Sequence, residues 1–286
     1  MTRTPFGNLF INAGAMKSGT TWLYWALRFN KDLYFSLEKE VHYFHRKYVD
    51  SYILTDAHRV NQVKNLYVHE MTNENTGIQE MREYARWLTV YLRSPMNDDW
   101  YAEVIHPPHK QTWSCDFSNL YAQLPAWAWK DIAASCAQLR VLFLLRDPLH
   151  RLWSHIKFDL KYNGQLDQLP NWSPQQISDY LRQPHIWYNA EYGEAIRRLQ
   201  SGVGHGQAKF MFLPEHHTDA LGFLREVERF VGVTEATYPP WVLRDKVNKS
   251  DPMPMPDFFP DLFRDDVDRI KQDMRDAGII PPESWL

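Results

Sequence analysis

The stretch Gly14-Ala-Met-Lys17-Ser18-Gly19-Thr20-Thr21 separates a short apolar run, Leu9 to Ala13, from a segment with helical periodicity that begins at Thr20. The apolar side chains of that segment recur at helical spacing, and they are Trp22, Leu23, Trp25, Ala26 and Phe29. The stretch therefore predicts a strand, a glycine-containing loop and a helix in succession. The unpaired amide N–H groups and the dipole at the N-terminus of such a helix suit a phosphate group.

The same order of strand, loop and helix recurs twice further along the chain. A continuous β-prone run from Arg140 to Leu145 precedes a helical segment from Leu149 to Tyr162. A third run, Lys209 to Leu213, precedes an amphipathic stretch that Gly232 ends, with apolar residues at Phe223, Leu224, Val227, Phe230 and Val231. Strands that alternate with helices predict an α/β fold, a P-loop-like parallel sheet flanked by helices, with ligands at the carboxyl ends of its strands.

Two segments do not follow this order. The stretch from Asp50 to Asp99 is polar with scattered aromatic residues, which predicts helices rather than sheet. The stretch from Tyr238 to Pro260 contains many prolines and no helical period. It predicts an extended loop that crosses the surface.

Bulk composition favours a single soluble domain over residues 1–286. A hydrophobic content of 44% can bury one large core. The formal net charge of −3 gives no reason to expect a nucleic-acid or anionic-membrane partner. The two cysteines, Cys115 and Cys136, are too few for a disulfide framework and favour a reducing compartment. The first apolar run is too short for a signal-peptide core or a membrane span, so a cytoplasmic location is expected.

The glycine loop departs from the pattern that binds a nucleoside triphosphate with magnesium. Its lysine lies two positions before Gly19 rather than directly after it, and the glycine is followed by two threonines. A triphosphate with magnesium is therefore a poor fit to this loop. The alternative interpretation is a plain glycine turn with a surface lysine.

The run Lys17-Ser-Gly-Thr-Thr-Trp22 closely resembles the 5′-phosphosulfate loop of sulfotransferases, in the same strand, loop and helix context. The resemblance implies the donor 3′-phosphoadenosine 5′-phosphosulfate. Lys17 would contact the bridging oxygen of the leaving phosphate, and Trp22 would lie against the adenine or simply face the core. The residues implied to hold the 5′-phosphosulfate are Lys17, Ser18, Gly19, Thr20 and Thr21.

A guanidinium and a hydroxyl group, those of Arg146 and Ser154, lie eight residues apart where the second strand passes into its helix. Arginine offers a forked and permanently charged donor and serine a neutral one, which suits a phosphate. Their spacing resembles the 3′-phosphate motif of the same family. The alternatives are a common helix entrance at Arg146 and a small packing residue at Ser154, and Arg151 is a weaker candidate that can be structural.

A charged turn after the first helix runs into an alternating segment. If that segment is extended, Glu40, His42 and Phe44 share one face. Sulfuryl transfer benefits from a base that removes the acceptor proton and from a cation at the departing phosphate oxygens. We therefore expect Glu40 or His42 as the base and Lys17 as the cation. The alternatives are a solvated charge cluster and a metal site that includes His45.

The segment Glu38-Lys-Glu-Val-His-Tyr-Phe44 resembles the Lys-Glu-x-His-Phe-Phe stretch of heparan-type and bacterial carbohydrate sulfotransferases, with tyrosine in place of the first phenylalanine. In that branch the glutamate, here Glu40, acts as the base. A weaker likeness includes Asp116-Phe-Ser-Asn-Leu-Tyr121. Lys246 and Lys249 lie where the family closes a basic loop over the 3′-phosphate, which implies a contact for Lys249. The Lys-Gly pair of that loop and the cysteine pair of many heparan-type enzymes are both missing from this sequence.

These observations predict a sulfotransferase that uses a single in-line displacement without a metal. The acceptor would be a hydroxyl or amine of a carbohydrate or other small molecule, and residues 50–99 would form the acceptor side of the cleft. Two alternatives are a P-loop small-molecule kinase and a catalytically inactive nucleotide-binding interaction module. The identity of the acceptor and the oligomeric state stay open. Five tryptophans can stack on an acceptor or form core, and they are Trp87, Trp100, Trp113, Trp127 and Trp129.

Overall fold

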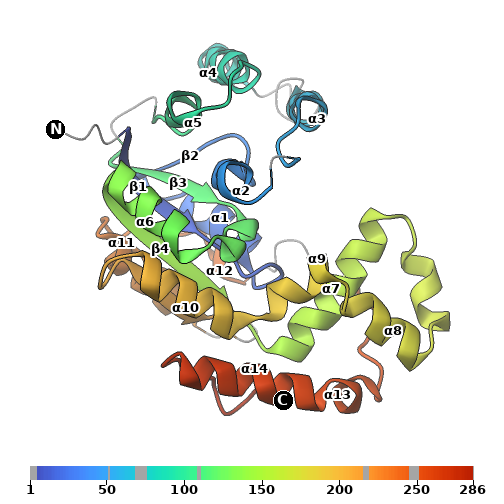
Figure 1. Ribbon diagram of the computed structural model, residues 1–286. Helices are drawn as coiled ribbons and strands as arrows, with labels where there is room; N and C mark the ends of the chain where they lie inside the picture. The colour runs from blue at the N-terminus through green and yellow to red at the C-terminus, as the bar shows by residue number, and fades with distance from the viewer. Residues whose placement is uncertain are drawn as a thin grey trace.

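A parallel sheet forms the centre of the computed structural model, which describes residues 5–50, 52–67, 76–107, 111–214, 219–244 and 251–285 (Figure 1). Within those residues the strands, in spatial order, are β2 (Leu33–Phe35), β3 (Trp113–Phe117), β1 (Phe6–Asn12), β4 (Cys136–Leu145) and β5 (Ala208–Phe212). Every adjacent pair is parallel. The carboxyl ends of the strands therefore lie at one edge of the sheet, as the sequence predicts.

Helices cover both faces of the sheet (Figure 1). The helices before β4 are α1 (Thr20–Leu27), α2 (Tyr43–Tyr48), α3 (Asp56–Leu66), α4 (Ile78–Tyr91), α5 (Asp98–Val104), the 3₁₀ helix η2 (Asn119–Gln123) and α6 (Ala126–Ser135). Those between β4 and β5 are α7 (Pro148–Tyr162), η3 (Leu166–Asn171), α8 (Pro174–Leu181), α9 (Pro184–Trp187), η4 (Tyr188–Ala190) and α10 (Tyr192–Gly202). After β5 follow α11 (Ala220–Val231), α12 (Pro240–Arg244), α13 (Phe259–Leu262) and α14 (Arg264–Asp276).

Side chains of the central strands alternate between two buried clusters, one on each face of the sheet. On β4, Val141 and Phe143 belong to the first cluster, whereas Leu142 and Leu144 belong to the second. The first cluster includes side chains of α6, α7, α10 and α14, and the second includes those of α1, α11 and α12. Because both faces are covered, β4 reads in the sequence as a continuous apolar run rather than an alternating one.

The sequence predicts β1, β4, β5 and the helices that follow them, but not β2 or β3. β2 has only three residues, and β3 contains the polar residues Ser114 and Asp116. All five side chains of β3 are buried because the strand lies between β1 and β2. Short or polar strands of this kind carry no hydrophobic pattern that the sequence alone reveals.

The proline-rich stretch is not purely extended, so that prediction is wrong in part. It contains α12 and the start of α13, each with proline at one of its first two positions. Proline suits those positions because the missing N–H has no partner there in any helix. The prediction for residues 50–99 is confirmed, since the described part of that stretch forms α3, α4 and the start of α5.

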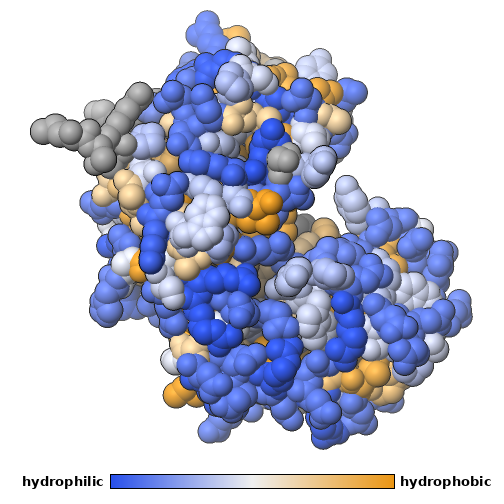
Figure 2. Space-filling view, viewed as in Figure 1, coloured by the Kyte–Doolittle hydropathy of each residue, from blue (hydrophilic) through white to orange (hydrophobic). Residues whose placement is uncertain are grey.

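The surface is hollowed between the part of the molecule formed by α3 to α5 and the part formed by α7 to α9 (Figure 2). The loops after the strands reach this region, because α2 follows β2 and α7 follows β4. The carboxyl edge of the sheet is therefore the place to look for a site.

Candidate functional site

The loop between β1 and α1 forms the first part of the site. Lys17 and Gly19 both have left-handed backbone conformations, with φ of 69° and 81°. A Cβ atom at Gly19 would lie 2.6 Å from the Leu213 side chain, so both conformation and space require glycine. No side chain caps α1, and its first turn contains no acidic residue. The first N–H groups of α1, those of Thr20 and Thr21, are therefore open to an anion.

Lys17 and Arg146 lie together at this loop. The Lys17 ammonium is 4.1 Å from the centre of the Phe158 ring, and the Lys17 carbonyl oxygen accepts a 3.1 Å hydrogen bond from Arg146 Nη1. Burial, and then the charge of Arg146 and three further cations, lowers the pKa of Lys17 to about 8. Neither cation forms an ion pair with a carboxylate of the described residues. Within the described residues the loop thus holds two positive charges without an ion-pair partner, and the charge of the nearby Asp147 acts on Arg146.

Arg146 lies just before α7, and Ser154 lies about two turns after the start of that helix. The Asp147 side chain caps the helix, and a proline occupies its first position, which fixes where α7 begins. The Tyr192 hydroxyl donates a 3.0 Å hydrogen bond to the Arg146 carbonyl oxygen. Arg146 is half-buried and Ser154 is buried. The start of α7 is therefore held firmly beside the loop of Lys17.

Glu40 lies in the loop after β2, and its carboxylate is held from three directions. Asn119 donates from its backbone N–H to Oε2 at 2.9 Å and from Nδ2 to Oε1 at 2.8 Å. The Lys39 ammonium forms an ion pair with Oε1, and His42 Nε2 lies 3.4 Å from Oε2. The Glu40 side chain is 27% exposed, so a ligand can still reach it.

The segment after Glu40 is not extended, and the prediction that Glu40, His42 and Phe44 share one face of a strand is wrong. His42 has a left-handed conformation with φ of 56°, and α2 begins at the next residue. This turn still leaves the imidazole beside Glu40. Burial lowers the pKa of His42 to about 4, so the ring is neutral at pH 7.

A buried carboxylate, that of Asp116, fixes the position of this turn. It accepts hydrogen bonds from the Tyr101 hydroxyl at 2.7 Å, the Tyr121 hydroxyl at 2.8 Å and Ser118 Oγ at 2.6 Å. Ser118 Oγ in turn accepts the His42 N–H at 3.0 Å. The end of β3 therefore anchors the loop that carries Glu40.

We expect Asp116→Ala to lower the free energy of unfolding by about 3 kcal/mol or more, because three buried hydroxyl groups lose their acceptor. The measurement is urea unfolding followed by circular dichroism. Asp167→Ala removes a carboxylate from an exposed position of η3 and serves as the control. An equal loss in both variants would contradict the anchoring role of Asp116.

Asn119 is the site residue that the sequence does not single out. It lies in the Asp116 to Tyr121 stretch, at the start of η2 and two residues after the end of β3. Its position at the carboxyl end of a strand is the signal that could have identified it. A Cβ atom at Gly14 would lie 3.1 Å from the Asn119 carbonyl oxygen. The glycine therefore lets the loop after β1 pack closely against the residue that holds Glu40.

Trp22 lies in the core. Its side chain is 3% exposed, and its Nε1 donates a 2.9 Å hydrogen bond to the Val242 carbonyl oxygen of α12. Contact with an adenine, which the resemblance implies, would require α12 to move. Of the other loop side chains, those of Ser18 and Thr20 are buried and that of Thr21 is half-buried.

Several other predictions meet different outcomes. Lys246 and Lys249 lie outside the described residues, so the role of Lys249 stays a prediction.

The His45 ring lies 3.4 Å from Gln123 Oε1, and the described residues contain no group of three or more His, Cys, Asp or Glu placed to hold a metal ion. Of the five tryptophans considered for the acceptor, Trp127 is 58% exposed and the other four are buried, namely Trp87, Trp100, Trp113 and Trp129.

A search of the described helices for a membrane span finds none of sufficient length and apolar character.

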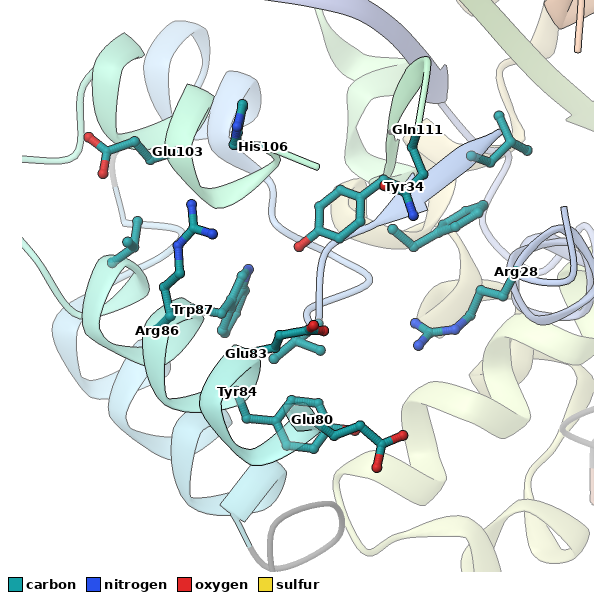
Figure 3. A pocket seen from close by; sticks show the side chains of 14 residues that line it. Arg28, Tyr34, Glu80, Glu83, Tyr84, Arg86, Trp87, Glu103, His106 and Gln111 are labelled. Atoms are coloured by element: carbon teal, nitrogen blue, oxygen red, sulfur yellow. The ribbon is translucent and has the colours of Figure 1, made fainter. Parts of the chain in front are cut away.

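A pocket of about 300 Å³ lies beside the edge strand β2, against α4 (Figure 3). In the close-up, the Tyr34 hydroxyl and the Glu83 carboxylate reach into the space between the strand and the helix, and the Arg28 guanidinium points in from the opposite side. Leu37 lines the pocket three residues before Glu40. Further lining residues are Glu80, Tyr84, Arg86, Trp87 and Glu103. The polar pocket of the α4 region thus borders the loop that carries Glu40.

Comparison with known proteins supports the fold. No protein-family model and no curated protein match the chain. Among solved structures it is similar to a sulfotransferase from Alicyclobacillus acidocaldarius, with a TM-score of 0.62 and 17% identity over 96% of this chain and 97% of that one. The chain therefore has a sulfotransferase fold.

Two further solved structures have lower TM-scores. The sulfotransferase domain of the Synechococcus PCC 7002 olefin synthase gives 0.46, with 16% identity over 99% of this chain and 92% of that one. The sulfotransferase domain from the curacin biosynthetic pathway gives 0.48, with 12% identity over 92% of this chain and 98% of that one.

Proposed function

We propose that the protein is a sulfotransferase that moves a sulfuryl group from 3′-phosphoadenosine 5′-phosphosulfate to a hydroxyl or amine of a carbohydrate or other small molecule. The observation that carries this proposal is the meeting of three groups at the carboxyl edge of the sheet. These groups are the open N-terminus of α1, the cations Lys17 and Arg146, which form no ion pair within the described residues, and the carboxylate of Glu40. The first two suit a polyanionic donor, and the third suits proton removal from an acceptor.

The residues around α1 fit the 5′-phosphosulfate of the donor. Open N–H groups, a helix dipole and an ammonium group favour an anion at this position. Lys17 would bind the bridging oxygen of the leaving phosphate. The remaining contacts would come from Ser18, Gly19, Thr20 and Thr21.

The start of α7 fits the 3′-phosphate. Arg146 would supply the charged donor and Ser154 the neutral one, with Lys249 as an additional cation from the segment outside the described residues. Trp22 would meet the adenine only after α12 moves away from its indole N–H. We therefore give Trp22 less weight than the phosphate-binding residues.

The donor supplies a sulfuryl group that is activated by its bond to phosphate. In the proposed displacement, the acceptor oxygen or nitrogen forms a bond to sulfur while the bond between sulfur and the bridging phosphate oxygen breaks. Glu40 takes the proton that the acceptor loses, and Lys17 stabilises the electron pair left on the phosphate. The oxidation state of sulfur does not change in this step, so it needs neither an oxidant nor a reductant.

We assign the base to Glu40 and a positioning role to His42. An imidazole with a pKa of about 4 is a weak proton acceptor at neutral pH. The Nε2 atom of His42 faces Glu40, whereas its Nδ1 atom is buried with no partner among the described residues. The tautomer with hydrogen on Nε2 would donate to Glu40 and hold the carboxylate in place.

The pocket between β2 and α4 supports a polar, hydroxyl-bearing acceptor. Aromatic rings such as Tyr34 and Tyr84 can pack against a sugar or another small ring, and the charged side chains can bind its hydroxyl groups. The lining residues include three carboxylates and two guanidinium groups, which together offer acceptors and donors to hydroxyl groups. A hydroxyl-bearing small molecule or carbohydrate is therefore a suitable acceptor.

We retain the expectation of a single domain that acts in a reducing cytoplasm. Both cysteines are free and buried, and the two buried clusters lie on opposite faces of one sheet. These features agree with the expectation and favour no other compartment.

The test is isothermal titration with 3′-phosphoadenosine 5′-phosphate, with and without magnesium. We expect micromolar, metal-independent binding to the wild type and an affinity at least about tenfold lower for Arg146→Ala, because the charge-assisted contact is lost. Arg140→Ala is the matched control, since Arg140 lies on β4, the strand that Arg146 follows, and donates to the Phe230 carbonyl oxygen. We expect it to bind like the wild type.

Each other outcome of this titration has a separate meaning. Absence of binding to the wild type would contradict the proposal. Binding that requires magnesium would favour a P-loop kinase. Binding without any sulfuryl transfer to a broad set of acceptors would favour the inactive nucleotide-binding module.

A further inference from the structure

Arg151 of α7 is a fully buried arginine with very few partners. Its exposed fraction is 0%. Its Nη1 atom lies 3.3 Å from His155 Nδ1, whereas Nε and Nη2 have no hydrogen-bond partner among the described residues. A buried ion that is neither paired nor fully hydrogen-bonded destabilises the folded state.

No carboxylate of the described residues forms an ion pair with Arg151. Burial lowers its pKa only to about 10, so the guanidinium is charged at neutral pH. Burial and then the charge of Arg151 lower the pKa of His155 to about 2, so this ring is neutral. In the tautomer with hydrogen on Nε2, its Nδ1 atom accepts from Arg151 Nη1. The other groups whose charges act on Arg151 are the Tyr192 phenol and a second cation, Arg146.

Arg59 provides a direct contrast, because it is a similarly buried arginine whose two Nη atoms both have hydrogen-bond partners and whose guanidinium has a carboxylate partner, although its Nε has none among the described residues. It is 2% exposed. Its guanidinium donates to the Tyr91 carbonyl oxygen at 2.6 Å, to the Arg93 carbonyl oxygen at 3.0 Å and to the Asp56 carboxylate at 2.6 Å. Arg59 thus ties α3 to the end of α4, which is a structural role. Arg151 lacks such bonds, and it lies instead within electrostatic reach of Lys17 and Arg146.

We propose that Arg151 is a positioning residue, a buried and uncompensated cation whose field strengthens the anion site of Lys17 and Arg146 at the expense of the stability of the ligand-free protein. The inference rests on the proposed function for the identity of the anion. A charge in a poorly polarisable interior acts on its surroundings with little screening by salt. The bound phosphates supply the opposite charge that the protein itself does not, so the ligand restores the stability that Arg151 removes.

The test compares Arg151→Met, Arg151→Lys and Arg59→Met. The two readouts are Tm in a phosphate-free and sulfate-free buffer and the affinity for 3′-phosphoadenosine 5′-phosphate. We expect Arg151→Met to raise Tm by about 2–4 °C or more, because an apolar side chain replaces a buried charge. The same variant is expected to bind about tenfold more weakly. Arg151→Lys keeps the charge and should retain most of the affinity, whereas Arg59→Met should lower Tm.

The opposite signs of the two effects distinguish this role from a structural one. If Arg151 only supports the fold, Arg151→Met will have both a lower Tm and a lower affinity for the nucleotide, or it will fail to fold. Either result overturns the inference. Unchanged affinity in Arg151→Met with normal binding by the wild type also overturns it and leaves the proposed function intact. If the wild type does not bind the nucleotide, the proposed function fails, and a titration with inorganic phosphate then tests the inference by the same comparison.

Discussion

Replacing Lys17 by methionine is expected to lower kcat for sulfuryl transfer by about 10²–10³-fold, the usual effect of removing one group that stabilises charge in a transition state. Methionine keeps the length of the side chain and removes only the ammonium group. The loop geometry should persist, since Arg146 donates to the Lys17 backbone carbonyl rather than to its side chain. The measurement is a single-turnover assay with labelled donor at saturation.

The same lysine is expected to make donor binding dependent on pH. Its pKa in the free protein, lowered to about 8, means that the ammonium is charged below this pH and loses its proton above it. Affinity for 3′-phosphoadenosine 5′-phosphate should therefore fall as pH rises through about 8, because only the charged form attracts the phosphate. Lys17→Met should lose this pH dependence and bind more weakly below pH 8.

Lys130→Met is the control for both measurements, because Lys130 is exposed on α6. It should leave kcat and the pH dependence as they are in the wild type. A kcat for Lys17→Met within a factor of about two of the wild type would contradict the role of Lys17 in the transition state.

Glu40→Gln is the second substitution for which a large effect is expected, a loss of about 10²–10⁴ in kcat, which is the usual contribution of a general base. Donor affinity should change little, since Glu40 lies after β2 and the phosphate-binding groups lie after β1 and β4. The pairing of a large loss in kcat with an unchanged donor affinity identifies a group that acts on the acceptor. The measurements are steady-state kinetics and calorimetric titration on the same preparation.

His42→Asn separates the two candidate bases. If Glu40 is the base, this variant should lose activity less than Glu40→Gln, because it removes only one contact to the carboxylate. A larger loss in His42→Asn would transfer the role of base to the imidazole. Glu194→Gln changes an exposed glutamate of α10 and should leave kcat unchanged.

The half of the site that we propose to bind phosphate can be predicted from the sequence because its determinants are local. A strand, a glycine loop and a helix N-terminus follow one another within a short stretch that ends in α1. The backbone N–H groups of that stretch point to an anion whatever surrounds them. The strands β1, β4 and β5 can likewise be predicted, since each contains a run of apolar residues, which β3 with Ser114 and Asp116 does not.

The half of the site that we propose to serve the acceptor was harder to predict from the sequence, because its geometry depends on contacts between segments that are distant in the chain. The left-handed turn at His42 is held by Ser118, which itself depends on the buried Asp116. Asn119 can donate hydrogen bonds to Glu40 because β3, which precedes Asn119, lies beside β2, which precedes Glu40. Strand order of this kind is a property of the folded sheet and leaves no local pattern in the chain.

The sequence by itself determined the class of fold, and it singled out the loop that we propose to bind the donor and the residue types that we propose for proton removal and charge stabilisation. The tertiary structure alone decided which of those residues meet. It also separated the two buried arginines, since Arg59 pairs with the Asp56 carboxylate, whereas Arg151 has no carboxylate partner among the described residues and lies near Lys17 and Arg146. The physical reason is that a helix N-terminus is built by consecutive residues, whereas burial and electrostatic coupling arise only when segments far apart in the chain pack together.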